Sequence, residues 1–96
     1  MAVAFCPMTL TEFLALDWII EILSPDQRII RVITKIQAFI AEGIRLGWLI
    51  DPSEEIVMIF HLDRPLEVSQ GDNVLTVLPD VQMTLTAAEI FSWIKS

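Results

Sequence analysis

The sequence predicts a mixed α/β (α+β) fold organised around residues 18–51, where a strand, a long helix and a second strand follow one another closely. Two short apolar runs without clean alternation, at 17–23 and 46–51, are typical of strands that are covered on both faces. The segment between them has the length and the apolar stripe of a helix. We therefore expect a βαβ unit, with two parallel strands and a right-handed crossover.

The helix is predicted from its start and stop signals. Ser24 suits the N-cap, Pro25 suits the first helical position, and Gln27 completes a capping box. Gly43 is placed at the left-handed C-terminal cap. At about 100° per residue, the arc expected to face the core holds Ile29, Ile30, Ile33, Ile36, Ile40 and Ile44. A second arc holds Arg28, Arg31, Lys35 and Glu42, with Val32 and Phe39 beside it.

The remaining elements flank this unit within one domain that spans residues 1–96. Residues 1–8 have no clear periodicity and predict an end that is frayed or ordered only on contact. Capping boxes at Thr9 with Glu12 and at Thr86 with Glu89 predict helices at 11–16 and 87–95. A strand at 56–61 completes an antiparallel hairpin with 46–51, followed by a short edge strand at 66–69 and another strand at 74–77.

Composition sets limits on the environment and the partners. In 96 residues, 54% are hydrophobic and the mean hydropathy is +0.61, which predicts apolar surface covered by a partner, most simply in a homodimer. The net charge of −7 argues against binding of nucleic acid through a broad basic surface but permits a local basic site. A single cysteine, no signal peptide and no apolar run of about 18 residues predict a cytoplasmic protein without a membrane segment.

Glu21 is the acidic residue embedded in the first apolar strand, near its carboxyl end, where open α/β sheets place their ligands. A buried carboxylate must be paired, hydrogen-bonded, metal-bound or neutralised. Lys35 lies ten residues after Pro25, about 15 Å back along the helix, and so near the level of Glu21. A metal-binding carboxylate beside a lysine that orients a water outlines metal-dependent phosphodiester hydrolysis. The alternative, a solvated lysine and an acid tied to backbone amides, stays open.

Other catalytic patterns are missing from the sequence. There is no glycine-rich phosphate loop, no zinc-binding set of Cys and His, and no Ser, His and acid arrangement with usable spacing. His61, at the end of a predicted strand, is interpreted as an edge or turn residue rather than a catalytic one. The tryptophans are interpreted as core and interface anchors rather than base-stacking platforms; they are Trp18, Trp48 and Trp93.

A family resemblance adds to this interpretation. The segments IIEILSPDQ and GIRLGWLIDP, the intervening Lys35, and a later strand, Leu-Pro dipeptide and closing helix resemble the Uma-two family of restriction endonucleases. This family is abundant in cyanobacteria and belongs to the PD-(D/E)XK nuclease superfamily. The resemblance covers residues 17–96, and residues 8–16 resemble the family's N-terminal helix. It implies a truncated restriction-endonuclease-like fold.

The resemblance assigns roles to individual residues. Glu21 corresponds to the acid of the E-x-K strand, and Lys35 to the lysine that many members carry on the following helix. Leu23 stands where the strand lysine would be, and Phe39 where relatives often have tyrosine. Relatives also have a longer upstream half, with a Pro-Asp motif whose aspartate is the first metal ligand. Here that half is missing between the N-terminal helix and the strand, and Asp17 does not replace the aspartate.

These observations predict a metal-dependent endonuclease-family domain that acts on DNA, with weak or no activity as an isolated chain. Glu21 and Lys35 are the expected catalytic residues, Glu21 is the ligand for Mg²⁺ or Mn²⁺, and Arg28 and Arg31 are the expected DNA contacts. One protein carboxylate is a poor site for Mg²⁺.

The alternative function is a non-catalytic dimerisation or regulatory module derived from the nuclease fold. It would associate through Val32, Phe39 and the tryptophan-bearing strands, or pair with a full-length relative. Binding of RNA or single-stranded DNA is disfavoured, because the chain is acidic and its basic residues are few.

Overall fold

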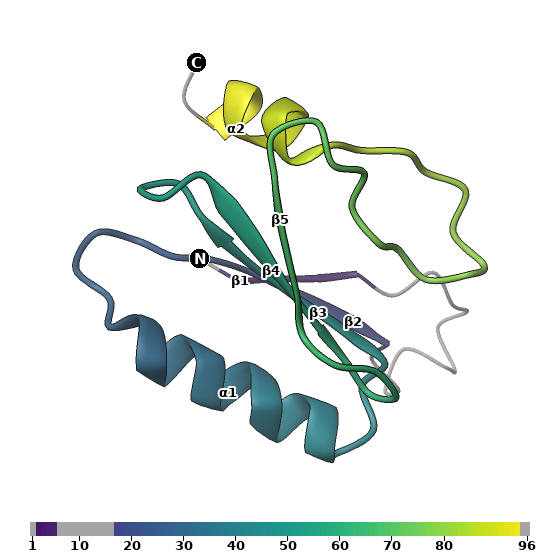
Figure 1. Cartoon of the computed structure of the whole chain (residues 1–96). Helices are drawn as coiled ribbons and strands as arrows, with labels where there is room; N and C mark the ends of the chain where they lie inside the picture. Colours follow the sequence, from purple (N-terminus) through teal and green to yellow (C-terminus); the bar gives the residue numbers. More distant parts are fainter. Residues whose placement is uncertain (1, 6–16, 95–96) are drawn as a thin grey trace.

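The computed structural model describes residues 2–5 and 17–94, which form one mixed sheet with helices on both faces (Figure 1). The strand order is β1-β2-β3-β4-β5. The strands are β1 (Ala2–Phe5), β2 (Trp18–Ile22), β3 (Leu46–Asp51), β4 (Ile56–His61) and β5 (Glu67–Gln70). Helix α1 (Ile29–Ala41) lies on one face, and α2 (Ala87–Ile94) lies on the other with the long segment that precedes it.

The predicted βαβ unit is confirmed. Strands β2 and β3 pair in parallel, from Trp18 opposite Leu46 to Ile22 opposite Ile50, with α1 as the crossover. Strands β3 and β4 form the expected antiparallel hairpin, and β5 pairs antiparallel with β4 one residue later than predicted. The α/β fold class predicted from the sequence is therefore correct, and Glu21 lies on a strand with neighbours on both sides.

Two predictions about the elements are wrong, and one falls outside the described residues. Residues 2–5 form strand β1, antiparallel to β2, rather than a frayed end; four apolar residues are too few to show a period. At 74–77 only an isolated bridge forms, between Val74 and Thr86, instead of a strand. The predicted helix at 11–16 lies outside the described residues.

The start of α1 differs from the prediction, whereas its end agrees. The backbone N–H of Ser24 donates to Gln27 Oε1, and the N–H of Gln27 donates to the Ser24 carbonyl, so the expected capping box closes a turn instead. Arg28 has an extended backbone, and the helix begins at Ile29. At the other end Gly43 has φ of 108°, and its N–H donates to Ile40 O in a Schellman cap.

The sheet separates two apolar layers. The layer on the α2 side contains Trp18 and Trp48, whose rings meet edge to face with centroids 4.9 Å apart. The Trp48 indole N–H donates to the Thr76 carbonyl at 3.0 Å, and this hydrogen bond holds the segment between β5 and α2 against the sheet. Two of the three tryptophans are therefore core anchors, and Trp93 on α2 is exposed. The buried residues of the α1 layer are Val32, Ile36, Leu49 and Phe60.

The helix is rotated relative to the predicted arcs. Val32, placed beside the basic arc by the sequence, is buried against the sheet, whereas Ile29 is exposed and Ile30 is 63% exposed. This rotation brings the basic flank of α1 over β2, and it leaves part of the predicted core arc facing solvent. Among the described helices, none is both long and apolar enough to cross a membrane.

Gly47 allows α1 to approach the sheet closely. A Cβ atom at this position would lie 2.7 Å from Cγ2 of Ile36, whose side chain is fully buried and stiff at χ1. We therefore expect Gly47→Ala to lower the free energy of unfolding by about 1–3 kcal/mol through overpacking. Urea unfolding monitored by tryptophan fluorescence measures this change. In an Ile36→Ala background the clash is gone, and an equal cost there would show that the close approach is not its cause.

Candidate functional site

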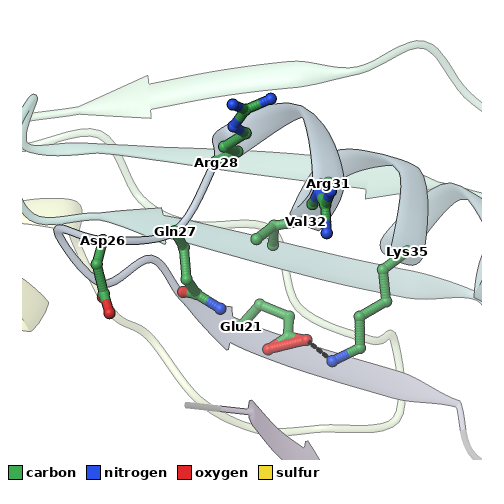
Figure 2. A pocket seen from close by; sticks show the side chains of 7 residues that line it. All are labelled: Glu21, Asp26, Gln27, Arg28, Arg31, Val32 and Lys35. Carbon is green, nitrogen blue, oxygen red and sulfur yellow. Dashed lines mark ion pairs between the residues drawn. The ribbon is translucent and has the colours of Figure 1, made fainter.

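Glu21 faces α1 from β2, an inner strand of the sheet. It pairs with Leu49 of β3, a residue of the α1 layer, and only 4% of its surface is exposed. The Lys35 ammonium reaches down from α1 to its carboxylate, with Nζ 2.5 Å from Oε1 (Figure 2). The lysine side chain is 51% exposed, so the pair connects a buried acid to solvent. The structure thus brings together the two residues that the sequence places at the site.

The position of Lys35 follows from the packing of its neighbours. Ile36, the next residue, is fully buried against β3 and fixes this turn of the helix on the sheet. Leu23 lies two residues after Glu21 and thus on the same face of the chain, and its apolar side chain packs against the α1 layer. The amine that reaches Glu21 therefore comes from the helix, because the strand position is filled by an apolar side chain.

A groove of about 440 Å³ runs between β2 and the first turns of α1. Its lining includes all four residues predicted for the site, together with two from the turn before the helix (Figure 2). They are Glu21, Asp26, Gln27, Arg28, Arg31, Val32 and Lys35. The lining contains three cationic side chains and two anionic ones, so the groove is locally basic on an acidic protein. In Figure 2 the Arg28 side chain points away from Glu21.

The sequence did not identify Asp26 and Gln27 as groove residues. The sequence predicts only a capping role for Gln27, and the turn that replaces this cap carries both residues to the groove. The Asp26 carboxylate accepts a hydrogen bond from the Ser24 hydroxyl at 2.9 Å. No sequence signal separates this turn from a cap, since the same side-chain contact occurs in both.

Two acids at the ends of the parallel strands, Asp17 before β2 and Asp51 in β3, lie outside the groove lining. Asp17 binds Arg45 at 3.1 Å, just before the start of β2 and away from the carboxyl end that carries Glu21. Asp51 is buried at the end of β3, where its Oδ1 accepts the backbone N–H groups of Ser53 and Glu54. Both carboxylates have structural partners, so neither adds a ligand to the Glu21 site.

The donor set fits a divalent metal only in part. Within residues 2–5 and 17–94, no cluster of three or more His, Cys, Asp or Glu side chains could hold a metal ion. Mg²⁺ is usually bound by one or two carboxylates plus substrate phosphates and several waters. Glu21 supplies one buried carboxylate, and Lys35 already neutralises it. The described residues therefore do not form a complete site for Mg²⁺ or Mn²⁺.

His61 lies apart from the groove, at the end of β4. Its Nε2 is 3.1 Å from Glu67 Oε2, within ion-pair distance but with poor hydrogen-bond geometry, and the Thr76 hydroxyl donates to the same oxygen at 2.8 Å. Burial raises the pKa of Glu67, but Thr76, His61 and Arg64 together outweigh it and lower that pKa below its ordinary value. The cluster joins β4, β5 and the segment before α2.

This pKa shift predicts how stability depends on pH. Because the folded-state pKa of Glu67 is below the unfolded one, its pairing stabilises the protein above the ordinary value of 4.5, and this contribution is lost as pH falls. We expect Glu67→Gln to lower Tm at pH 7 and to leave it unchanged at pH 3. Thermal unfolding at both pH values tests this expectation, with Glu54→Gln as a control at an exposed turn. An equal loss of Tm at both pH values would contradict it.

A mixed sheet with a βαβ unit, a buried acid–lysine pair and an arginine-lined groove defines a nuclease-like domain. The family model of Uma2, described as a putative restriction endonuclease, matches residues 10–88, and the chain belongs to this family. It is also similar to the crystal structure of a putative nuclease of DUF820 from Anabaena variabilis ATCC 29413, with 36% sequence identity and a TM-score of 0.78. That match covers 83% of this chain and 46% of the Anabaena chain, so the chain spans under half the length of that relative. No curated protein matches the chain.

Proposed function

We propose that this Uma2-family domain acts on DNA through the groove between β2 and α1. Glu21 and Lys35 are its catalytic residues, and Arg28 and Arg31 contact the phosphate backbone. We further propose that the chain alone hydrolyses phosphodiester bonds weakly or not at all, and that it works in the cytoplasm. The observation that carries the proposal is the Glu21–Lys35 ion pair inside a basic groove of a nuclease-family fold.

The proposed roles of the groove residues follow from the chemistry of their side chains. Arginine guanidinium groups bind phosphate oxygens well, so Arg28 and Arg31 would hold the backbone along the start of α1. Lys35, half exposed beside Glu21, can donate to a phosphate oxygen or orient a water. Mg²⁺ or Mn²⁺ would supply Lewis-acid chemistry when bound. Because Glu21 provides a single carboxylate, such an ion would be held weakly, and this is the reason to expect little hydrolysis.

Nicking of supercoiled plasmid tests the proposal. Wild type, Glu21→Gln and Lys35→Met are incubated with Mn²⁺ or Mg²⁺, and Arg64→Ala serves as a control outside the groove. We expect slow nicking at most in wild type and none in the two site variants. Nicking that persists in both site variants would show that other residues carry the activity.

A second candidate function, a homodimerising module without catalysis, is favoured by apolar side chains that are exposed in the described part of the chain. Val68 of β5 pairs with Met58, which packs against the α1 layer. Val68 therefore lies on the side of the sheet that α1 covers. Both Val68 and Ile30 are exposed. The interface expected from the sequence needs correction, because Val32 is buried and Phe39 is half-buried. We propose that a dimer would use Ile30 and Val68 instead. Light scattering of Ile30→Glu/Val68→Glu tests this, with exposed Val74→Glu as the control; an unchanged mass would reject it.

A further inference from the structure

The Glu21 carboxylate already has its counter-ion within the protein. The Lys35 ammonium contacts Oε1, and burial of the acid strengthens this attraction relative to water. A divalent cation at Glu21 would have to displace this ammonium or lie beside it against like-charge repulsion. Lys35 thus occupies, electrostatically, the place that a metal ion would take.

With Glu21 neutralised, the groove presents mainly positive charge. Arg28 and Arg31 remain, and the one other acid in its lining, Asp26, accepts a hydrogen bond from Ser24. Each cation that neutralises a phosphate releases a counter-ion, so two arginines give a weak but salt-dependent affinity for a polyanion. This charge distribution favours an anionic backbone over a free divalent cation.

We infer that the groove binds nucleic-acid phosphates without a divalent metal, with Lys35 as the built-in counter-ion of Glu21. The inference rests on the proposed function in taking DNA as the ligand. It has an unusual consequence: Glu21→Gln removes a negative charge and releases Lys35 as a third cation, so the variant binds DNA more tightly. In a groove that recruits DNA through a metal on Glu21, the same substitution weakens binding.

The experiment measures binding of a fluorescein-labelled DNA duplex by anisotropy, in EDTA and in Mg²⁺ at matched ionic strength. For wild type we expect equal affinities in both conditions and a slope of log K against log salt of about −1.8, from two phosphate contacts. Glu21→Gln should bind at least about fivefold more tightly and steepen the slope to about −2.7. Arg28→Ala/Arg31→Ala should lose most of the binding, whereas the control Arg64→Ala should not.

A second variant keeps the test independent of how Glu21→Gln folds. Lys35→Gln removes the built-in counter-ion and leaves the carboxylate uncompensated, so its DNA binding should weaken in EDTA and recover with Mg²⁺. Wild-type binding that requires Mg²⁺ and is lost in Glu21→Gln would overturn the inference and leave the proposed function standing. Binding that is undetectable, or that Arg28→Ala/Arg31→Ala does not change, would overturn both.

Discussion

Ala2→Asp is expected to add a second carboxylate beside Glu21, which a divalent metal ion would need in order to bind there. Position 2 pairs with Glu21 across the β1–β2 ladder. Directly paired residues share a face of the sheet, with Cβ atoms about 4.5–5.5 Å apart, which is close enough for two carboxylates to share one ion. We expect Mn²⁺ affinity, measured by calorimetry, to rise at least about tenfold, because charge count sets the affinity of carboxylate sites. Metal-dependent plasmid nicking should rise with it.

The register provides a matched control for this variant. Position 3 pairs with Ile20, so Val3→Asp adds the same charge to the same strand on the opposite face of the sheet. It should leave Mn²⁺ affinity unchanged, and the gain in Ala2→Asp should disappear when Glu21→Gln is added. Equal affinities for Ala2→Asp and Val3→Asp would contradict the proposal that Glu21 can bind a metal ion.

Ile36→Ala is expected to have the largest effect on stability among the helix substitutions. Its side chain is fully buried between α1 and β3, and truncation leaves a cavity at the contact that orients Lys35. Loss of buried methyl groups of this size costs about 2–5 kcal/mol in the free energy of unfolding. Guanidinium unfolding monitored by circular dichroism gives this value directly.

The same substitution elsewhere on α1 is the control. Ile30 is 63% exposed, and Ile30→Ala should change the free energy of unfolding by about 0.5 kcal/mol or less. Amphipathic periodicity alone places both isoleucines on one core arc and therefore predicts similar costs. Similar measured costs would show that the helix is not rotated as described.

Pattern and turn chemistry predict much of this fold from local information. The bounds of β3 and β4 agree with the predicted 46–51 and 56–61, because compact apolar runs ended by turn residues leave few alternatives. The cap at Gly43 and the capping box of Thr86 with Glu89 are also correct. For the site, the sequence indicates Glu21 because a carboxylate within an apolar strand needs a partner, and it indicates Lys35 by its distance along the helix.

Patterns along the chain are enough to predict the βαβ unit, the family, and the acid and lysine of the groove. The other features depend on contacts between elements that are far apart in the sequence. The contacts of Ser24 with Gln27 are compatible with a turn or a cap, so they do not place the start of the helix, which begins at Ile29 after an extended Arg28. The rotation that buries Val32 depends on the close approach of Ile36 to Gly47 and on the ion pair of Lys35 with Glu21. Both are contacts between α1 and the sheet. Strand β1 forms because the edge of β2 is open to pair with it, and a local pattern carries no information about that edge.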